Sequence, residues 1–196
     1  PIKRGMMFSG RKPKIIATVS VDDRSCAQRN GARRSSAVLC SMEGSRPLLV
    51  EIQALVSRTH FGSPRRLATG IDPQRLALLA AVLEKRLGVN LWDQDIYLNV
   101  VGGLQVEEPA ADLAIVAAIL SSLFNRAIAP STLIFGEVGL AGEVRATMFP
   151  EIRLKEAATL GFSRAVIPDQ PLIEAQSPLE MFRVRDLRKA QEALFS

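Results

Sequence analysis

The 196-residue sequence contains few of the residues from which metal and cofactor sites are built. It has one histidine, His60, and two cysteines, Cys26 and Cys40. Because a structural zinc site needs about four such ligands, these three residues do not make one by themselves. We therefore expect no metal in this chain and two free thiols in a reducing cytoplasm. His60 lies in an arginine-rich loop, where we interpret it as solvent-exposed rather than as a metal ligand or a general base.

The sequence also lacks long apolar runs and the usual phosphate-binding motifs. The run Leu113–Leu120 is well short of the roughly 20 residues that a membrane span requires, so it predicts a buried helix. The first ten residues lack the apolar region of a secretory signal, which favours a cytoplasmic protein without membrane contact. Without a GxxxxGKS/T loop, this chain alone is not expected to hydrolyse ATP. Gly102-Gly103 lacks the spacing of a dinucleotide fingerprint and predicts a close strand-to-helix turn.

The net charge of +5 is unevenly distributed along the chain. Residues 1–46 contain ten Lys and Arg against three Asp and Glu, a net charge of +7, whereas residues 47–196 contain fifteen against seventeen, a net charge of −2. We predict that residues 1–46 are a basic, poorly ordered segment that contributes one edge strand at most, from Ile15–Val19. That segment is either a nucleic-acid-binding arm or a solvated linker. Nucleic-acid binding by the rest of the chain must come from local patches.

From Pro47 onward the apolar pattern becomes regular and predicts a folded domain over residues 47–196. Apolar residues at every second position predict a strand with one buried face: Leu48, Val50, Ile52, Ala54 and Val56. After a polar loop over residues 58–66, Asp72-Pro73 predicts the start of a helix that Gly88 ends. The apolar stripe of that helix consists of Leu76, Leu79, Ala80, Leu83 and Leu87.

The remaining elements alternate between strands and helices. We predict strands over residues 96–101, 132–138, 143–146, 164–168 and 182–184, and helices over residues 109–124, 150–161 and 186–195. In the helix that Pro150 begins, the expected apolar residues are Ile152, Leu154, Ala157, Ala158 and Leu160. This order, with one hairpin, indicates an α+β or mixed α/β domain.

The start of the helix over 109–124 is where an enzyme often places its chemistry, because free N–H groups of a first helical turn can stabilise an anion. The residues there include no nucleophile: Glu107, Glu108, Pro109, Ala110, Ala111 and Asp112. Glu107, Glu108 and Asp112 are candidates for a metal site if they converge. We favour the alternative that the helix dipole stabilises these carboxylates without a ligand.

Two further sets of residues are candidates for function. Ser121-Ser122 with Lys155 is the pair that a Ser/Lys hydrolase could use. We do not favour it, because serines three turns into a helix usually bond the carbonyl four residues back and have no oxyanion donors nearby. A basic cluster can contact successive phosphates, with solvated surface side chains as an equal alternative: Arg58, Arg65, Arg66 and Arg75.

Four segments carry a resemblance to a known family: MEGSRPLLVEIQALV, RRLATGIDPQRLALLAAVLEKR, DIYLNVVGGLQVEEPAADLAIVAAILSS and GEVGLAGEVRATMFPEIRLKEAATLGFSRAVIP. Over about residues 42–196 the sequence resembles the C-terminal Lon-protease-like domain of the RadA (Sms) family of bacterial DNA-repair proteins. The resemblance implies the α+β fold of Lon proteolytic domains, which is related to the second domain of ribosomal protein S5.

The resemblance also implies that the protease site is degenerate. Lon proteases carry their catalytic serine in a Gly-Pro-Ser-Ala-Gly motif, and the matching residues are Glu108, Pro109, Ala110, Ala111 and Asp112. Ala110 therefore stands at the position of the nucleophile, and an ungapped match places Glu151 at the position of the partner lysine. We expect no acyl transfer at this place. The alternative is a residual Ser/Lys peptidase that uses Ser122 and Lys155.

The family further implies partners and a role. The resemblance implies a hexameric ring in which each subunit contains a zinc finger, a RecA-like ATPase and this domain. It also implies a role in branch migration of recombination intermediates. The resemblance implies a homo-oligomer, single-stranded or branched DNA, and a RecA-type recombinase as candidate partners. ATP and zinc belong to the full-length family, so no cofactor is expected in this chain. The expected role is a hexamer scaffold and DNA-contacting surface.

Overall fold

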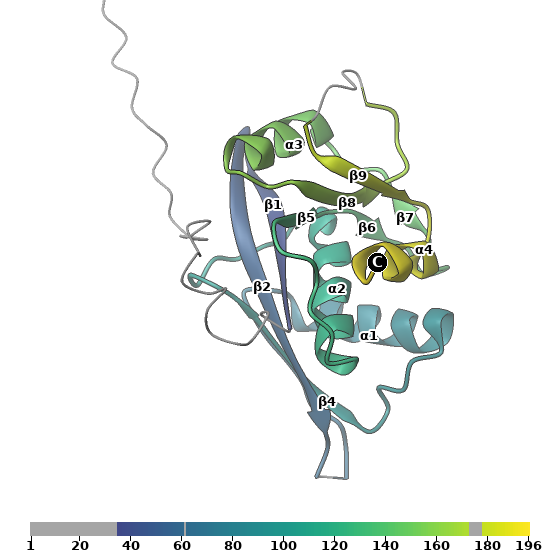
Figure 1. The fold of residues 1–196 in the computed structure, drawn as a ribbon. Helices are drawn as coiled ribbons and strands as arrows, with labels where there is room; N and C mark the ends of the chain where they lie inside the picture. Colours follow the sequence, from purple (N-terminus) through teal and green to yellow (C-terminus); the bar gives the residue numbers. More distant parts are fainter. Residues whose placement is uncertain (1–34, 61, 173–177) are drawn as a thin grey trace, which may run out of the picture.

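A seven-stranded sheet and four α-helices organise the residues that the computed structural model describes, which are 35–60, 62–172 and 178–196 (Figure 1). The elements, in chain order, are β1 (Ser36–Glu43), β2 (Arg46–Arg58), β3 (Arg66–Thr69), α1 (Pro73–Leu87), β4 (Gln94–Val100), the 3-10 turn η1 (Pro109–Ala111), α2 (Asp112–Leu123), β5 (Thr132–Ile134), β6 (Glu137–Val138), β7 (Val144–Arg145), α3 (Pro150–Thr159), β8 (Arg164–Pro168), β9 (Glu180–Val184) and α4 (Leu187–Leu194). The prediction of a mixed α/β domain is confirmed at this level.

The sheet is mixed, with the strand order β3-β4-β2-β1-β5-β8-β9. The β1–β2 hairpin and the β2–β4 pair are antiparallel, whereas β3–β4, β1–β5, β5–β8 and β8–β9 are parallel. The two short strands β6 and β7 form a separate antiparallel hairpin, as predicted. The long strand β2 therefore joins an outer part of the sheet, β4 and β3, to an inner part that begins with β1.

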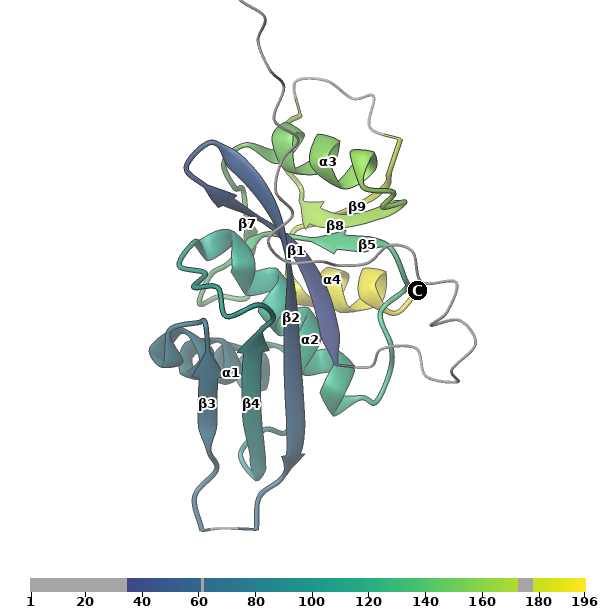
Figure 2. The ribbon, with the colours of Figure 1, turned by 90° about the vertical axis from the view of Figure 1, so that its left-hand side faces the viewer.

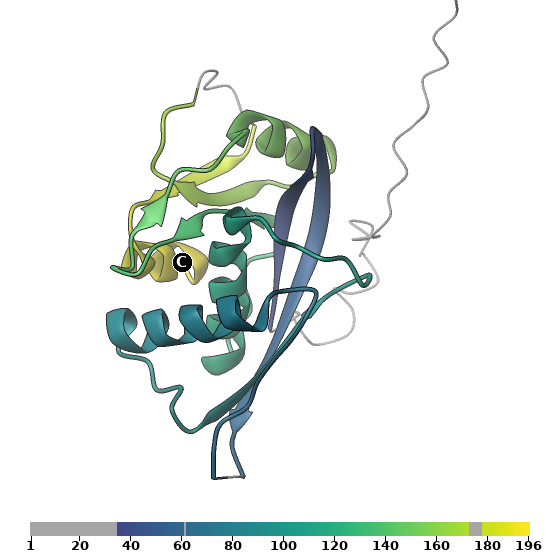
Figure 3. The ribbon, with the colours of Figure 1, turned by 180° about the vertical axis from the view of Figure 1, so that it is seen from behind.

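The helices lie on both sides of this sheet. α2 packs against β1 and β2, and α1 packs against β3 and α2. α3 and α4 lie on opposite sides of β8 and β9 (Figures 1 and 3). Helix α2 is the centre of the core, because its residues from Asp112 to Ser121 are all buried. The other face of β2, β4 and β3 faces the viewer in Figure 2, and no helix of the described residues covers it.

The strongest local predictions are confirmed. In β2 the predicted inward residues Val50, Ile52 and Ala54 are buried, and Leu55, which follows Ala54, is exposed. Leu49 and Glu51, predicted to face outward, are buried too, so the single buried face is confirmed only for the second half of the strand. At the start of α1, the carboxylate of Asp72 accepts a hydrogen bond of 2.9 Å from the Gln74 amide, and Gly88 ends the helix in the left-handed conformation. Asp186 caps α4 in the same way, accepting from the Lys189 amide at 2.9 Å.

Other predictions differ from the structure. The folded part begins before residue 47, because β1 pairs with β2 over its whole length and lies inside the sheet. The strand β3 was not predicted; it begins at Arg66, the last residue of the predicted polar loop. Residues 132–138 form two strands instead of one. In α3, Ile152 is exposed and Arg153 is buried, so the predicted apolar stripe was wrong at that turn. The run Ile15–Val19 lies outside the described residues.

Candidate functional site

The segment that leads into α2 is closed by its own backbone. Ala110 is 4% exposed, and its carbonyl accepts a hydrogen bond of 2.9 Å from the Gly136 amide. The Leu113 amide in the first turn of α2 donates to the Gly136 carbonyl at 3.0 Å. An amide that could stabilise an oxyanion is therefore already used within the fold.

Glu108 forms an ion pair with Arg153 of α3. Arg153 Nη2 lies 2.6 Å from Glu108 Oε2, Nη1 lies 3.0 Å from Oε1, and Oε1 also accepts from the Met42 amide at 2.9 Å. The same guanidinium donates to the Cys40 and Met148 carbonyls, and it lies 5.6 Å from the ring centre of Phe135. Glu108 makes no capping hydrogen bond to the helix start, so an arginine, rather than the helix dipole alone, balances its charge.

Asp112 forms a second ion pair on the other side of the same segment. Its carboxylate is 1% exposed and accepts from Arg75 of α1, with Nε 2.6 Å from Oδ1 and Nη2 in contact with Oδ2. The Val138 amide donates to Oδ2 at 3.0 Å. Burial raises the pKa of Asp112, and the hydrogen bonds from Arg75 and Val138 oppose that rise. The hydrogen bond to Asp112 raises the pKa of Arg75.

Glu108, Asp112 and Arg75 border a cleft of about 760 Å³. Its walls come from the end of β3 and the start of α1 on one side and from residues 105–112 on the other. Gly70 sets the first wall, because its φ of +82° and the closeness of the Leu104 carbonyl and Val100 leave no room for a Cβ. Across the cleft the Val106 amide donates to the Gly70 carbonyl at 2.9 Å.

The predicted carboxylate cluster does not converge on a metal. Glu108 and Asp112 each pair with a different arginine, and Glu107 is exposed. Within residues 35–60, 62–172 and 178–196 no group of three or more His, Cys, Asp and Glu side chains is placed to hold a metal ion. His60 is exposed, as expected. Cys40 is buried and free, and burial raises the pKa of its thiol to about 12; Cys26 lies outside the described residues.

The serines of α2 bond to the backbone rather than to a base. Ser122 Oγ accepts from the Val56 amide at 2.9 Å. Ser121 Oγ accepts from the Ser35 amide at 3.0 Å and donates to the Arg126 carbonyl at 2.6 Å, so the expected bond to the carbonyl four residues back is not the one found.

Lys155 of α3 lies near the opposite end of the β1–β2 hairpin from Ser122. Arg153 contacts the Cys40 carbonyl, and Cys40 pairs with Leu49, seven residues before Val56 on β2. At about 3.3 Å per residue, Ser122 and the start of α3 are roughly 20 Å apart. The fold does not bring Ser122 and Lys155 together. Glu151, at the position matched to the protease lysine, lies half-buried in the first turn of α3.

The four predicted phosphate-binding arginines do not form one patch. Arg58, Arg65 and Arg66 lie at one end of the sheet, where β2 ends and β3 begins, whereas Arg75 lies beyond the other end of β3. Arg66 donates to the Gln94 and Leu91 carbonyls, and burial lowers its pKa. Arg58 is well exposed, with its Nε 3.6 Å from Asp93.

Sequence reasoning missed Arg153, whose guanidinium connects β1, α3 and the start of α2. An available signal was its spacing of four residues from Ala157, which places both on the buried face of α3.

Comparison with known proteins shows sequence similarity to one part of longer bacterial proteins. The chain is 50% identical over 162 residues to the DNA repair protein RadA of Pseudomonas aeruginosa, a match that covers 82% of the chain and 36% of that protein. It is 49% identical over 162 residues to RadA of Bacillus subtilis, covering 83% and 35%. The chain is homologous to bacterial RadA.

RadA of Aquifex aeolicus is 46% identical over 160 residues, covering 82% of the chain and 36% of that protein. The chain therefore spans about a third of the length of the curated RadA relatives that it matches. No protein-family model matches the sequence. Within the part of the chain that the structure describes, no helix is long and apolar enough to cross a membrane.

Proposed function

We propose that this chain is a non-catalytic, Lon-protease-like domain of a RadA-type DNA-repair ATPase, in which it holds subunits in a ring, a hexamer by family resemblance, and contacts DNA. The observation that carries the proposal is the pair of ion pairs at the start of α2. Glu108 and Asp112 are bound to Arg153 and Arg75, and between them Ala110 offers no nucleophile. A segment held in this way stabilises the fold and is poorly suited to bind a reacting carbonyl.

An exposed apolar row supports the scaffold part of the proposal. On the open face of the sheet Tyr97 stands between Leu55 and Leu67, since it pairs with both in the strand register. This face of β2, β4 and β3 is turned to the viewer in Figure 2. Leu55 is 57% exposed and Leu67 is 55% exposed, and a hollow of about 720 Å³ lies over the face. Exposed apolar patches of this kind mark association surfaces. We assign this face to contact with a second copy of the chain.

Light scattering tests the scaffold role. We expect a molar mass several times the 21.3 kDa of one chain, and a lower mass for Leu67→Asp, because a carboxylate would be desolvated in the interface. Leu140→Asp, at a leucine that is 62% exposed in the β6–β7 turn, is the matched control and should keep the mass of the unaltered protein. A mass of one chain at every concentration would count against the scaffold.

The second candidate function is the Ser/Lys peptidase of Ser122 and Lys155. The hydrogen bond from the Val56 amide to Ser122 Oγ and the distance along β2 both weigh against it. For DNA contact, Arg58 and Arg65 remain candidates because both are exposed, whereas Arg66 and Arg75 hold the fold together.

A further inference from the structure

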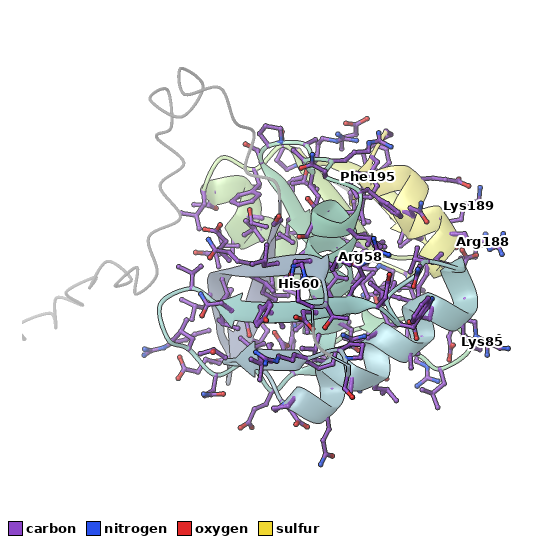
Figure 4. The ribbon with its side chains drawn as sticks, turned by 90° about the horizontal axis from the view of Figure 1, so that it is seen from below. Arg58, His60, Lys85, Arg188, Lys189 and Phe195 are labelled. Atoms are coloured by element: carbon purple, nitrogen blue, oxygen red, sulfur yellow. The ribbon has the colours of Figure 1, made fainter. Side chains whose placement is uncertain are left out.

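A groove of about 400 Å³ lies where the end of α1, the turn after α2 and the helix α4 meet. It is separate from the cleft at the start of α2 and shares no residue with it. Its lining residues are Leu87, Arg126, Arg188, Gln191, Glu192 and Phe195. Figure 4 shows Lys85, Arg188 and Lys189 along the same side of the molecule, at the ends of α1 and α4 that border this groove.

One wall of the groove holds an arginine in a fixed position. Arg126 Nη2 donates to the Phe195 carbonyl at 2.7 Å, and the guanidinium carbon lies 5.0 Å from the centre of the Phe195 ring. The Phe195 ring in turn packs edge-to-face on Phe124, with 6.0 Å between ring centres. An exposed arginine that is stacked and hydrogen-bonded loses less conformational freedom when it binds an anion.

The charge inside the groove is positive. Its one acid, Glu192, has its carboxylate 2.8 Å from Lys189 Nζ, so the field of that acid is largely balanced. Among the described residues, Arg188 and Lys85 have no ion-pair partner, and both are exposed. Because residues 47–196 carry a net charge of −2, this excess of positive charge is local to the groove and its rim.

The size of the groove favours a single-stranded polyanion over a duplex. A hollow of about 400 Å³ is too small for a duplex, but it has room for part of a single strand. Arginine forks on two walls can bind phosphate oxygens, and a positively charged groove along the backbone is a common feature of single-strand binding. We propose that this groove binds the backbone of single-stranded nucleic acid, with Arg126 and Arg188 on its phosphates. The proposal rests on the proposed DNA contact and locates that contact at this groove.

Fluorescence anisotropy of the full chain with a labelled oligothymidylate, measured over a series of salt concentrations, tests the proposal. The variants are Arg188→Gln, which removes a side chain without partners, and the double variant Arg126→Gln/Arg188→Gln. Arg183→Gln, at an exposed arginine of β9 outside the groove, is the matched control. We expect the double variant to bind about tenfold more weakly at low salt, and its slope of log affinity against log salt to fall by about 1.4.

The outcomes separate this proposal from the one on which it rests. If the unaltered chain binds and the double variant binds equally well, the groove is wrong and DNA contact lies elsewhere, for example on the basic residues 1–46. If the control loses as much affinity as Arg188→Gln, the groove is again wrong. If the unaltered chain does not bind at low salt, the DNA contact itself fails. Displacement by polyglutamate as effective as by unlabelled oligothymidylate would overturn the choice of nucleic acid over an acidic peptide.

Discussion

Buried Arg153 of α3 and partly buried Glu108 at the start of α2 form an ion pair that connects three distant parts of the chain. The arginine side chain is 2% exposed and also donates to carbonyls of Cys40 and Met148. The pair thus joins β1, the segment before α3 and the turn η1. Removing either partner would leave the other with a charge that the fold does not balance.

Arg153→Met is therefore expected to lower the free energy of unfolding by about 3–5 kcal/mol, because Glu108 and two carbonyls lose their donor. Equilibrium unfolding in urea measures the change. Arg145→Met is the control, since Arg145 pairs with Glu137 and Glu143 at the surface and its loss should lower stability far less. Equal losses in the two variants would show that the pair at the start of α2 is not structural.

Asp95 makes stability depend on pH. The Arg65 amide donates to its carboxylate at 2.8 Å, and this hydrogen bond is the main reason that its pKa is lowered. A lowered pKa contributes stability above the unfolded-state value of about 4, and that contribution is lost as the pH falls through the folded-state value.

Asp95→Asn should accordingly be less stable than the unaltered protein at pH 7, and the difference should shrink as the pH falls below about 4. Urea midpoints measured over this pH range follow the effect. A difference that stays constant with pH would mean that Asp95 acts through its shape rather than its charge.

Gly70→Ala tests the wall of the cleft. The added Cβ would meet the Leu104 carbonyl and lie 2.6 Å from Val100 Cβ, in addition to the strain of a φ of +82°. Gly103→Ala has a similar φ of +71° but no atom within 4 Å, so it should show the backbone strain alone, about 1–2 kcal/mol. Thermal unfolding should therefore give a clearly lower Tm for Gly70→Ala. Equal Tm values would mean that the cleft wall moves freely.

Local signals predicted most of the elements. Asp72 and Gly88 around α1 and Asp186 before α4 each act on a few neighbouring residues, and each was found as expected. The alternating residues of β2 predicted the strand, although its first half is buried on both faces. The strands β1 and β3 were missed because their evidence lies in pairing: β3 has four residues, and β1 follows a polar, arginine-rich stretch. Their partners are far away in the sequence, where periodicity gives no information.

The candidate site, too, could be predicted from the sequence only in part. That the start of α2 lacks a nucleophile could be read from Ala110 and its neighbours. That Glu108 and Asp112 pair with arginines 45 and 37 residues away could not, because such contacts depend on how α1 and α3 pack. For the same reason, the prediction from sequence placed Arg75 in one cluster with Arg58 and did not identify the groove of Arg126 and Arg188.

The most direct test of the central claim, that the start of α2 is structural and no serine of this chain is catalytic, is labelling with an active-site serine reagent. The samples are the unaltered protein, Ser122→Ala and Ala110→Ser, followed by intact mass measurement. The account predicts no covalent adduct in any of them, because Ser122 is bonded to the Val56 amide and position 110 is buried without a nearby lysine at the matched position, Glu151. An adduct on the unaltered protein that disappears in Ser122→Ala would contradict it.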